Sequence, residues 1–110
     1  MLLCIDTGNT QTVIGLFEGK ELADHWRIGT VTGRTADELA LMMQQFLGFH
    51  GFSFDDQVTG VAVCSGVPSV TAALRAMVQG QSEVSVRFTA LSVEESVASW
   101  NADELSYVSS

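Results

Sequence analysis

The sequence has few basic residues and no long apolar run. Only 5 of its 110 residues are Lys or Arg, against 13 Asp or Glu, so the net charge is −8. This charge repels nucleic acid at long range, and nucleic-acid binding is not expected. No apolar stretch reaches the roughly 18 residues that a membrane-spanning helix needs. The N-terminus has no basic segment before its apolar residues, as a signal peptide would, so we expect a cytoplasmic protein with no membrane partner.

Cysteine is also scarce, since Cys4 and Cys64 are the only two. Each lies in an apolar, strand-like run. Without a secretory signal a disulfide is not expected, and the spacing fits no zinc site. Buried free thiols are therefore predicted. The apolar fraction of 46% and charged fraction of 16% are typical of one globular domain.

The first thirty residues predict an antiparallel meander of three strands. The apolar runs at residues 2–6 and 12–17 are separated by the turn-forming and polar residues 7–11. A second turn at residues 18–20 leads into a third predicted strand, residues 21–28. Strands that follow one another through tight turns usually pair in antiparallel fashion.

A helix, a strand and a second helix are predicted next. Thr35 and Glu38 have the spacing of a capping box, which opens an amphipathic helix. After a loop at residues 51–57, the Val-rich segment Val58–Cys64 predicts a strand. Ser69 is the predicted N-cap of a helix over the following residues, 70–78. The order favours an α/β fold with a mixed sheet.

The character of the sequence changes after residue 79. Residues 80–110 are rich in Ser, Val and Glu. They contain one predicted strand, residues 84–91, and a short helix over residues 94–100 with Ser92 as its N-cap.

The segment Asp6-Thr7-Gly8-Asn9-Thr10 is the strongest candidate for chemistry. It follows one predicted strand and opens another. Gly8 permits a turn with positive φ, and successive amides of such a turn can bind phosphate oxygens. Asp6 offers the hard oxygen that Mg²⁺ prefers. Further neutral donors are Asn9, Thr10 and Thr12. The alternative reading of the same residues is an ordinary hairpin turn.

Four segments of the chain resemble type III pantothenate kinases in order and spacing. They are residues 1–17, His25-Trp26-Arg27-Ile28, Arg34-Thr35-Ala36-Asp37-Glu38 and Ser65-Gly66-Val67-Pro68-Ser69-Val70-Thr71. The resemblance implies a ribonuclease-H-like lobe of the actin, Hsp70 and sugar-kinase superfamily, with the three-strand meander followed by helix, strand and helix in a mixed sheet.

The same resemblance implies a reaction and its cofactors. Type III pantothenate kinases phosphorylate pantothenate to 4′-phosphopantothenate with ATP, the first step of coenzyme A biosynthesis. They use Mg²⁺ and a monovalent cation, K⁺ or NH₄⁺, and form homodimers. Matched by position, the ATP-binding residues are Asp6, Thr7, Gly8, Asn9, Thr10, Gln11, Thr12 and Val13. Asp6 is also expected to hold Mg²⁺, directly or through water.

The sequence departs from the family in residues 80–110. The Gly-Ala-Asp-Arg-like segment that carries the family's catalytic aspartate is missing. Its nearest equivalent, Asn101-Ala102-Asp103-Glu104, lacks both the Gly and the Arg, so no catalytic residue is assigned. We therefore expect residues 1–79 to be an ATP-binding lobe. Residues 80–110 are expected to be a divergent tail, from a truncated or frame-shifted reading or from a diverged protein, and the chain alone should have no kinase activity.

Two other functions stay open at this stage. The first is a non-catalytic binding or regulatory protein on the same scaffold, similar to an accessory factor for transcription. The second is a sugar kinase, although Asn9 argues against it because sugar kinases usually have Gly-Gly-Thr in this hairpin. The absence of a second lobe also predicts an uncovered face at Leu39, Met42 and Phe46, or an uncovered strand at residues 58–64. His25 and His50 are expected to have surface or packing roles.

Overall fold

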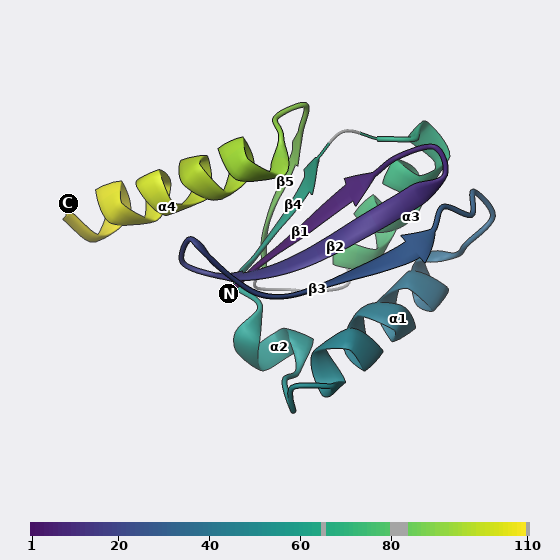
Figure 1. Cartoon of the computed structure of the whole chain (residues 1–110), viewed down its shortest axis with the longest axis horizontal. Coiled ribbons are helices and arrows are strands. Elements are labelled where there is room, and N and C mark those ends of the chain that lie inside the picture. The colour runs from purple at the N-terminus through teal and green to yellow at the C-terminus, as the bar shows by residue number, and fades with distance from the viewer. Residues whose placement is uncertain (65, 80–83, 110) are drawn as a thin grey trace.

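The computed structural model describes residues 1–64, 66–79 and 84–109, with side chains as far as residue 102. It is a five-stranded sheet in the order β3-β2-β1-β4-β5, with helices on both faces (Figure 1). The strands are β1 (Leu2–Thr7), β2 (Gln11–Glu18), β3 (Glu21–Gly29), β4 (Gly60–Cys64) and β5 (Ser85–Thr89). The helices are α1 (Ala36–Gly48), α2 (Phe54–Gln57), α3 (Pro68–Gln79) and α4 (Val93–Ser109).

The predicted meander of three strands is confirmed. β1 pairs with β2, and β2 with β3, each in antiparallel orientation. The register places Asp6 opposite Val13 and Thr7 opposite Thr12. At the turn between β2 and β3, Gly19 has φ +59°, a conformation that glycine adopts readily and other residues avoid.

The two remaining strand pairs are parallel, which makes the sheet mixed as predicted. β4 lies between β1 and β5 and pairs with both in parallel orientation. All five residues of β4 are buried. The predicted fold class, a ribonuclease-H-like α/β lobe, is confirmed by this strand order with its intervening helices.

Side chains of the central strands alternate between two apolar cores, because successive residues of a strand point to opposite faces. Leu3 and Ile5 lie in the larger core under α1 and α3. Leu2 and Cys4 lie in the smaller core under α4, beside Trp100. The expectation of an uncovered face was wrong for Leu39, which is buried in the larger core, and for β4, whose residues Gly60–Cys64 are all buried. Met42 and Phe46 are half-buried, and Thr59, just before β4, is exposed.

The helix starts follow local chemistry, with one correction. The capping box of Thr35 and Glu38 is present at the start of α1. The prediction of Ser69 as an N-cap was wrong, because α3 already begins at Pro68. Proline suits the first helical position since its missing N–H would have no partner there. The carbonyl of Val67 then accepts the first helical hydrogen bond, from the Thr71 amide at 2.9 Å.

A short helix lies within the segment predicted to be a loop at residues 51–57. α2 begins after Ser53, whose hydroxyl accepts a hydrogen bond from the Asp56 amide. Its single turn is too short to show a helical period, so the sequence pattern could not reveal it.

Residues 84–100 contribute to the same sheet and to the smaller core. β5 adds the fifth strand, and the first turns of α4 pack on the face opposite α1 and α3 through Val93, Val97 and Trp100. The C-terminal part of α4 extends beyond the sheet (Figure 1). The predicted cap at Ser92 is confirmed, because its hydroxyl accepts from the Glu95 amide and its own amide donates to the Glu95 carboxylate. The helix then runs past residue 100 to Ser109. Within the described ranges, no helix has the length and apolar character needed to cross a membrane.

Candidate phosphate-binding hairpin

The turn between β1 and β2 projects from one end of the sheet (Figure 1). Gly8, Asn9 and Thr10 are exposed there. The Gly8 amide donates to the Gln11 carbonyl at 2.9 Å and closes the turn. The amides of Asn9 and Thr10 donate no hydrogen bond to another residue of the described chain. The turn therefore presents two adjacent, solvated N–H donors.

The reason for glycine at position 8 differs from the one expected. Gly8 does not have a positive φ; within the described ranges only Gly19 and Gly51 do. Instead, a Cβ at position 8 would lie 3.0 Å from the Gln11 carbonyl oxygen. That oxygen is backbone and accepts the hydrogen bond that closes the turn, so it cannot move away cheaply. Glycine is favoured here by space rather than by backbone torsion.

The eight predicted residues lie together in the hairpin, but their side chains are in three different environments: two are half-buried on one face of the sheet, two are buried on the other face, and four residues are exposed at the turn. Asp6 and Val13 face each other across the β1–β2 pair, and both are half-buried. Thr7 and Thr12 face the opposite side and are 2% and 4% exposed. The remaining four, Gly8, Asn9, Thr10 and Gln11, are exposed at the turn. Only the turn and the Asp6 side are open to a ligand.

Thr30 and Arg27 contact the hairpin and were not predicted. The Thr30 amide donates to the Thr10 carbonyl at 2.9 Å, and its hydroxyl donates to the Gly8 carbonyl at 2.7 Å. The Arg27 guanidinium donates to the side-chain oxygen of Gln11 at 3.1 Å. Neither contact could be found from sequence distance, because they depend on the register of β2 with β3.

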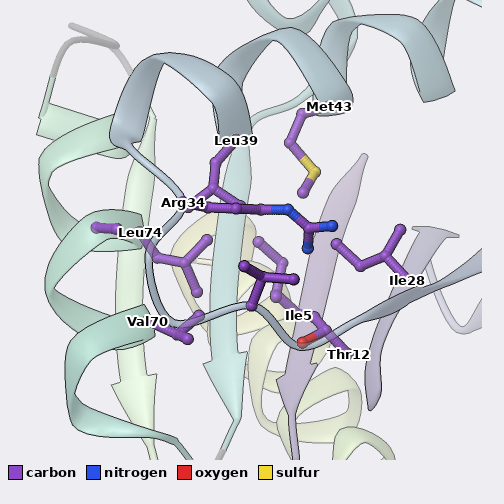
Figure 2. Close-up of a pocket in the computed structure, with 10 residues that line it drawn as sticks. Ile5, Thr12, Ile28, Arg34, Leu39, Met43, Val70 and Leu74 are labelled. Carbon is purple, nitrogen blue, oxygen red and sulfur yellow. The ribbon is translucent and has the colours of Figure 1, made fainter. Parts of the chain in front are cut away.

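A small apolar pocket lies next to the hairpin, between the sheet and helices α1 and α3 (Figure 2). Ile5 and Thr12 contribute to it from the hairpin strands, and the Arg34 side chain lies across it. The Arg34 guanidinium donates to the Gly29 carbonyl at 2.7 Å. This hydrogen bond therefore connects the loop that contains Arg34 to the end of β3, next to the hairpin.

Comparison of the sequence with known proteins shows its family. The family model described as "Type III pantothenate kinase" matches residues 2–103. The chain belongs to the type III pantothenate kinase family. The match continues beyond residue 79, through β5 and into α4.

Individual relatives carry the same name. The chain is 53% identical over 78 residues to the type III pantothenate kinase of Streptomyces griseus, which covers 68% of this chain and 29% of that protein. Identity to the Frankia casuarinae protein of this name is 54% over 78 residues, and the match covers 71% of this chain and 29% of that protein. Identity to the Myxococcus xanthus protein of this name is 47% over 77 residues, and the match covers 70% of this chain and 30% of that protein. The chain thus spans less than a third of the length of these kinases.

The two cysteines of this pantothenate kinase family member are buried free thiols, as predicted. They lie on neighbouring strands on the face under α4. The Cys64 thiol is 3.3 Å from the Ser96 hydroxyl. A hydrogen bond with Cys64, together with burial, raises the pKa of Cys4 above its usual range. Cys4 is therefore a neutral thiol near pH 7. No cluster of three or more His, Cys, Asp or Glu side chains suited to a metal occurs among the residues described.

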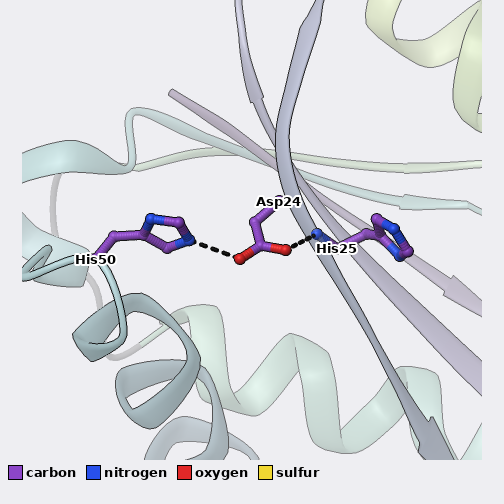
Figure 3. Close-up of polar contacts among 3 residues, drawn as sticks. All are labelled: Asp24, His25 and His50. Carbon is purple, nitrogen blue, oxygen red and sulfur yellow. Dashed lines mark hydrogen bonds and ion pairs between the residues drawn. The ribbon is translucent and has the colours of Figure 1, made fainter.

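His25 and His50 are both close to Asp24, which the sequence did not indicate (Figure 3). The His50 Nε2 is 2.6 Å from one Asp24 carboxylate oxygen, and the His25 backbone amide donates to the other at 2.7 Å. The His50 ring also stacks on Phe52. The contact of His50 with Asp24 joins β3 to the segment after α1, a structural role that agrees with the one expected for His50.

We predict that this pair makes part of the chain's stability depend on pH. The hydrogen bond from His50, followed by that from the His25 amide, lowers the pKa of Asp24. A carboxylate with a lowered folded pKa contributes stability above its unfolded pKa of about 3.9, and loses it as the pH falls through the folded value. Asp24→Asn lacks this contribution at every pH. Wild type should therefore melt higher than Asp24→Asn at pH 5–6, and the difference should shrink below about pH 4.

Thermal unfolding between pH 2 and pH 6 would check this. The control is Asp24→Asn in a His50→Gln background, where the aspartate has lost its main partner and the substitution should matter less. A melting difference that is unchanged from pH 6 to pH 2 would contradict the assignment.

Proposed function

We propose that this chain is the ATP-binding part of a type III pantothenate kinase, with the hairpin Asp6–Val13 holding the phosphates of ATP. The observation that carries the proposal is the exposed turn, where the Asn9 and Thr10 amides have no partner among the described residues and lie close in sequence to Asp6. Family membership supports phosphoryl transfer from ATP to pantothenate as the reaction of the whole enzyme, giving 4′-phosphopantothenate for coenzyme A biosynthesis in this proposal.

The residues present suit a magnesium-bound nucleotide. Consecutive turn amides bind phosphate oxygens well because their dipoles point toward the anion. The half-buried Asp6 carboxylate offers the hard oxygen that Mg²⁺ prefers, directly or through a water molecule. When bound, Mg²⁺ neutralises charge on the phosphates. In this proposal Thr7, Thr12 and Val13 give the hairpin its shape, while Gly8, Asn9, Thr10 and Gln11 face the ligand.

The rest of the activity belongs to the whole enzyme in this proposal. The pantothenate site, the catalytic residue, the K⁺ or NH₄⁺ ion and the homodimer would come from the longer protein, which acts in the cytoplasm. Residues 1–79 would contain the ATP-binding residues, and the divergent tail, residues 80–110, would add β5 and α4 to the same lobe. The DNA that follows the codon for Gln79 tests the origin of the tail: a shifted reading frame that restores a Gly-Ala-Asp-Arg-like segment would establish a frame-shift.

The proposed site is tested by substituting Asp6 with asparagine. We expect Asp6→Asn to weaken binding of Mg²⁺·ATP by about 10- to 100-fold, the range usual for loss of a group that supports a bound metal. Binding is measured by isothermal titration calorimetry with and without Mg²⁺. Asp55→Asn is the matched control, because Asp55 is an exposed carboxylate on α2 and has no part in the hairpin.

The outcomes separate the candidate functions. Affinity that needs Mg²⁺ and falls in Asp6→Asn but not in Asp55→Asn supports the kinase function. Equal affinity in all three proteins would refute the assignment of Asp6. Binding of a macromolecule by a chain that does not bind nucleotide would favour a regulatory function.

A further inference from the structure

Thr30 connects the end of β3 to the turn of the phosphate-binding hairpin. It makes three hydrogen bonds there, one through its amide and two through its hydroxyl. The amide donates to the Thr10 carbonyl at 2.9 Å, and the hydroxyl donates to the Gly8 carbonyl at 2.7 Å. Its hydroxyl oxygen is also 2.9 Å from the Thr12 hydroxyl. Thr30 thus donates hydrogen bonds to the carbonyls of both residues that flank Asn9, Gly8 and Thr10.

The donor of each hydrogen bond between Thr12, Thr30 and Gly8 can be assigned by counting hydroxyl protons. A threonine hydroxyl has one proton, and that of Thr30 is used on the Gly8 carbonyl. In the contact between the two hydroxyls, Thr12 must therefore be the donor and Thr30 the acceptor. The proton of Thr12, which is 4% exposed, points into the protein and is not available to a ligand. Thr12 supports Thr30, and Thr30 supports the turn.

The direction of the carbonyls decides where the amides point. In each peptide unit the N–H and C=O groups are antiparallel, because the peptide bond is planar and trans. The Gly8 carbonyl belongs to the same peptide unit as the Asn9 amide, so holding the carbonyl toward Thr30 turns the Asn9 amide the opposite way. The Thr10 carbonyl shares its peptide unit with the Gln11 amide, so the hydrogen bond from the Thr30 amide orients the Gln11 amide in the same manner.

We propose that Thr30 is a positioning residue for phosphate binding: its hydroxyl holds the Gly8 carbonyl inward so that the Asn9 amide faces the phosphates. This inference rests on the proposed function of the hairpin and adds the residue that orders it. Preorganised donors bind better because less conformational freedom is lost when the ligand arrives. The hydroxyl, rather than the bulk of the side chain, is the group that matters.

The test compares Thr30→Val, which keeps the shape and removes the hydroxyl, with Thr30→Ser, which keeps the hydroxyl. Ligands are Mg²⁺·ATP, inorganic triphosphate with Mg²⁺, and adenosine. We expect Thr30→Val to bind both phosphate ligands about three- to tenfold more weakly, the effect of one hydrogen bond, and adenosine unchanged. Thr30→Ser should retain most of the wild-type affinity. In the unliganded protein, exchange of the Gly8 amide should be faster in Thr30→Val by a similar factor.

The results distinguish this inference from the function on which it rests. If the wild-type chain binds neither phosphate ligand, the proposed function fails, and the exchange rate of Gly8 alone decides whether Thr30 orders the turn. If the wild type binds and Thr30→Val binds equally well, the positioning role is refuted. An equal loss in Thr30→Val and Thr30→Ser, or an equal loss for adenosine, would show general damage to the fold and would also refute it.

Discussion

Replacing Leu47 with alanine should lower the free energy of unfolding by about 2–5 kcal/mol. Leu47 is fully buried near the end of α1, within the larger core. Alanine would remove apolar contacts and leave a cavity that the packed strands and helices can fill only in part. Small domains are stable by about 5–15 kcal/mol, so this loss is a large fraction of the total. Urea unfolding followed by circular dichroism would measure it as a lower midpoint.

Leu41 provides the matched control on the same helix. Its side chain is 56% exposed, so Leu41→Ala makes the same chemical change without opening a core cavity. Helix propensity changes equally in both variants, since each replaces leucine with alanine inside α1. We expect Leu41→Ala to stay within about 0.5 kcal/mol of wild type. Similar losses in the two variants would mean that α1 does not pack on the sheet by the face that contains Leu47.

The sequence predicted those parts of the fold whose signals are local. The meander could be predicted because its strands are joined by tight turns, and the first helix because Thr35 and Glu38 make a capping box. The burial of Leu39 could not be predicted, because it depends on which distant elements pack against the sheet. Burial of β4 requires β5, which begins 21 residues after β4 ends and has only a weak pattern of its own.

The hairpin between β1 and β2 was predicted as a chain segment, but its geometry was not. Asp6, Gly8 and Asn9 could be singled out because turn residues follow an acid at the end of an apolar run. The burial of Thr12 and the contacts of Thr30 follow from strand register, which a sequence pattern does not specify. The torsion of Gly8 was predicted wrongly because glycine has two uses, conformational freedom and lack of volume, and the sequence does not distinguish them.

Replacing Gly60 with valine should displace α4 from the sheet. A Cβ at position 60 would overlap Cζ2 and Cη2 of Trp100, whose ring packs directly on the glycine backbone. Trp100 is 7% exposed and shares the smaller core with Leu2 and Val97. The indole would have to leave this site, which should cost about 3–5 kcal/mol, as for removal of a buried aromatic side chain. In a Trp26→Phe background, the fluorescence of Trp100 should shift to that of a solvated indole.

Gly29→Val is the control, because a Cβ at position 29 of β3 meets no atom within 4 Å. It makes the same substitution in another strand and should leave stability and the Trp100 fluorescence nearly unchanged. The comparison also bears on residues 80–110. If they pack as part of the lobe, Gly60→Val must be costly, because only α4 supplies the ring that lies over Gly60. A Gly60→Val protein with wild-type stability and a buried Trp100 spectrum would show that α4 does not occupy this face. Another part of the protein would then have to pack on Leu2, Cys4, Ala62 and Cys64, the strand residues of the smaller core.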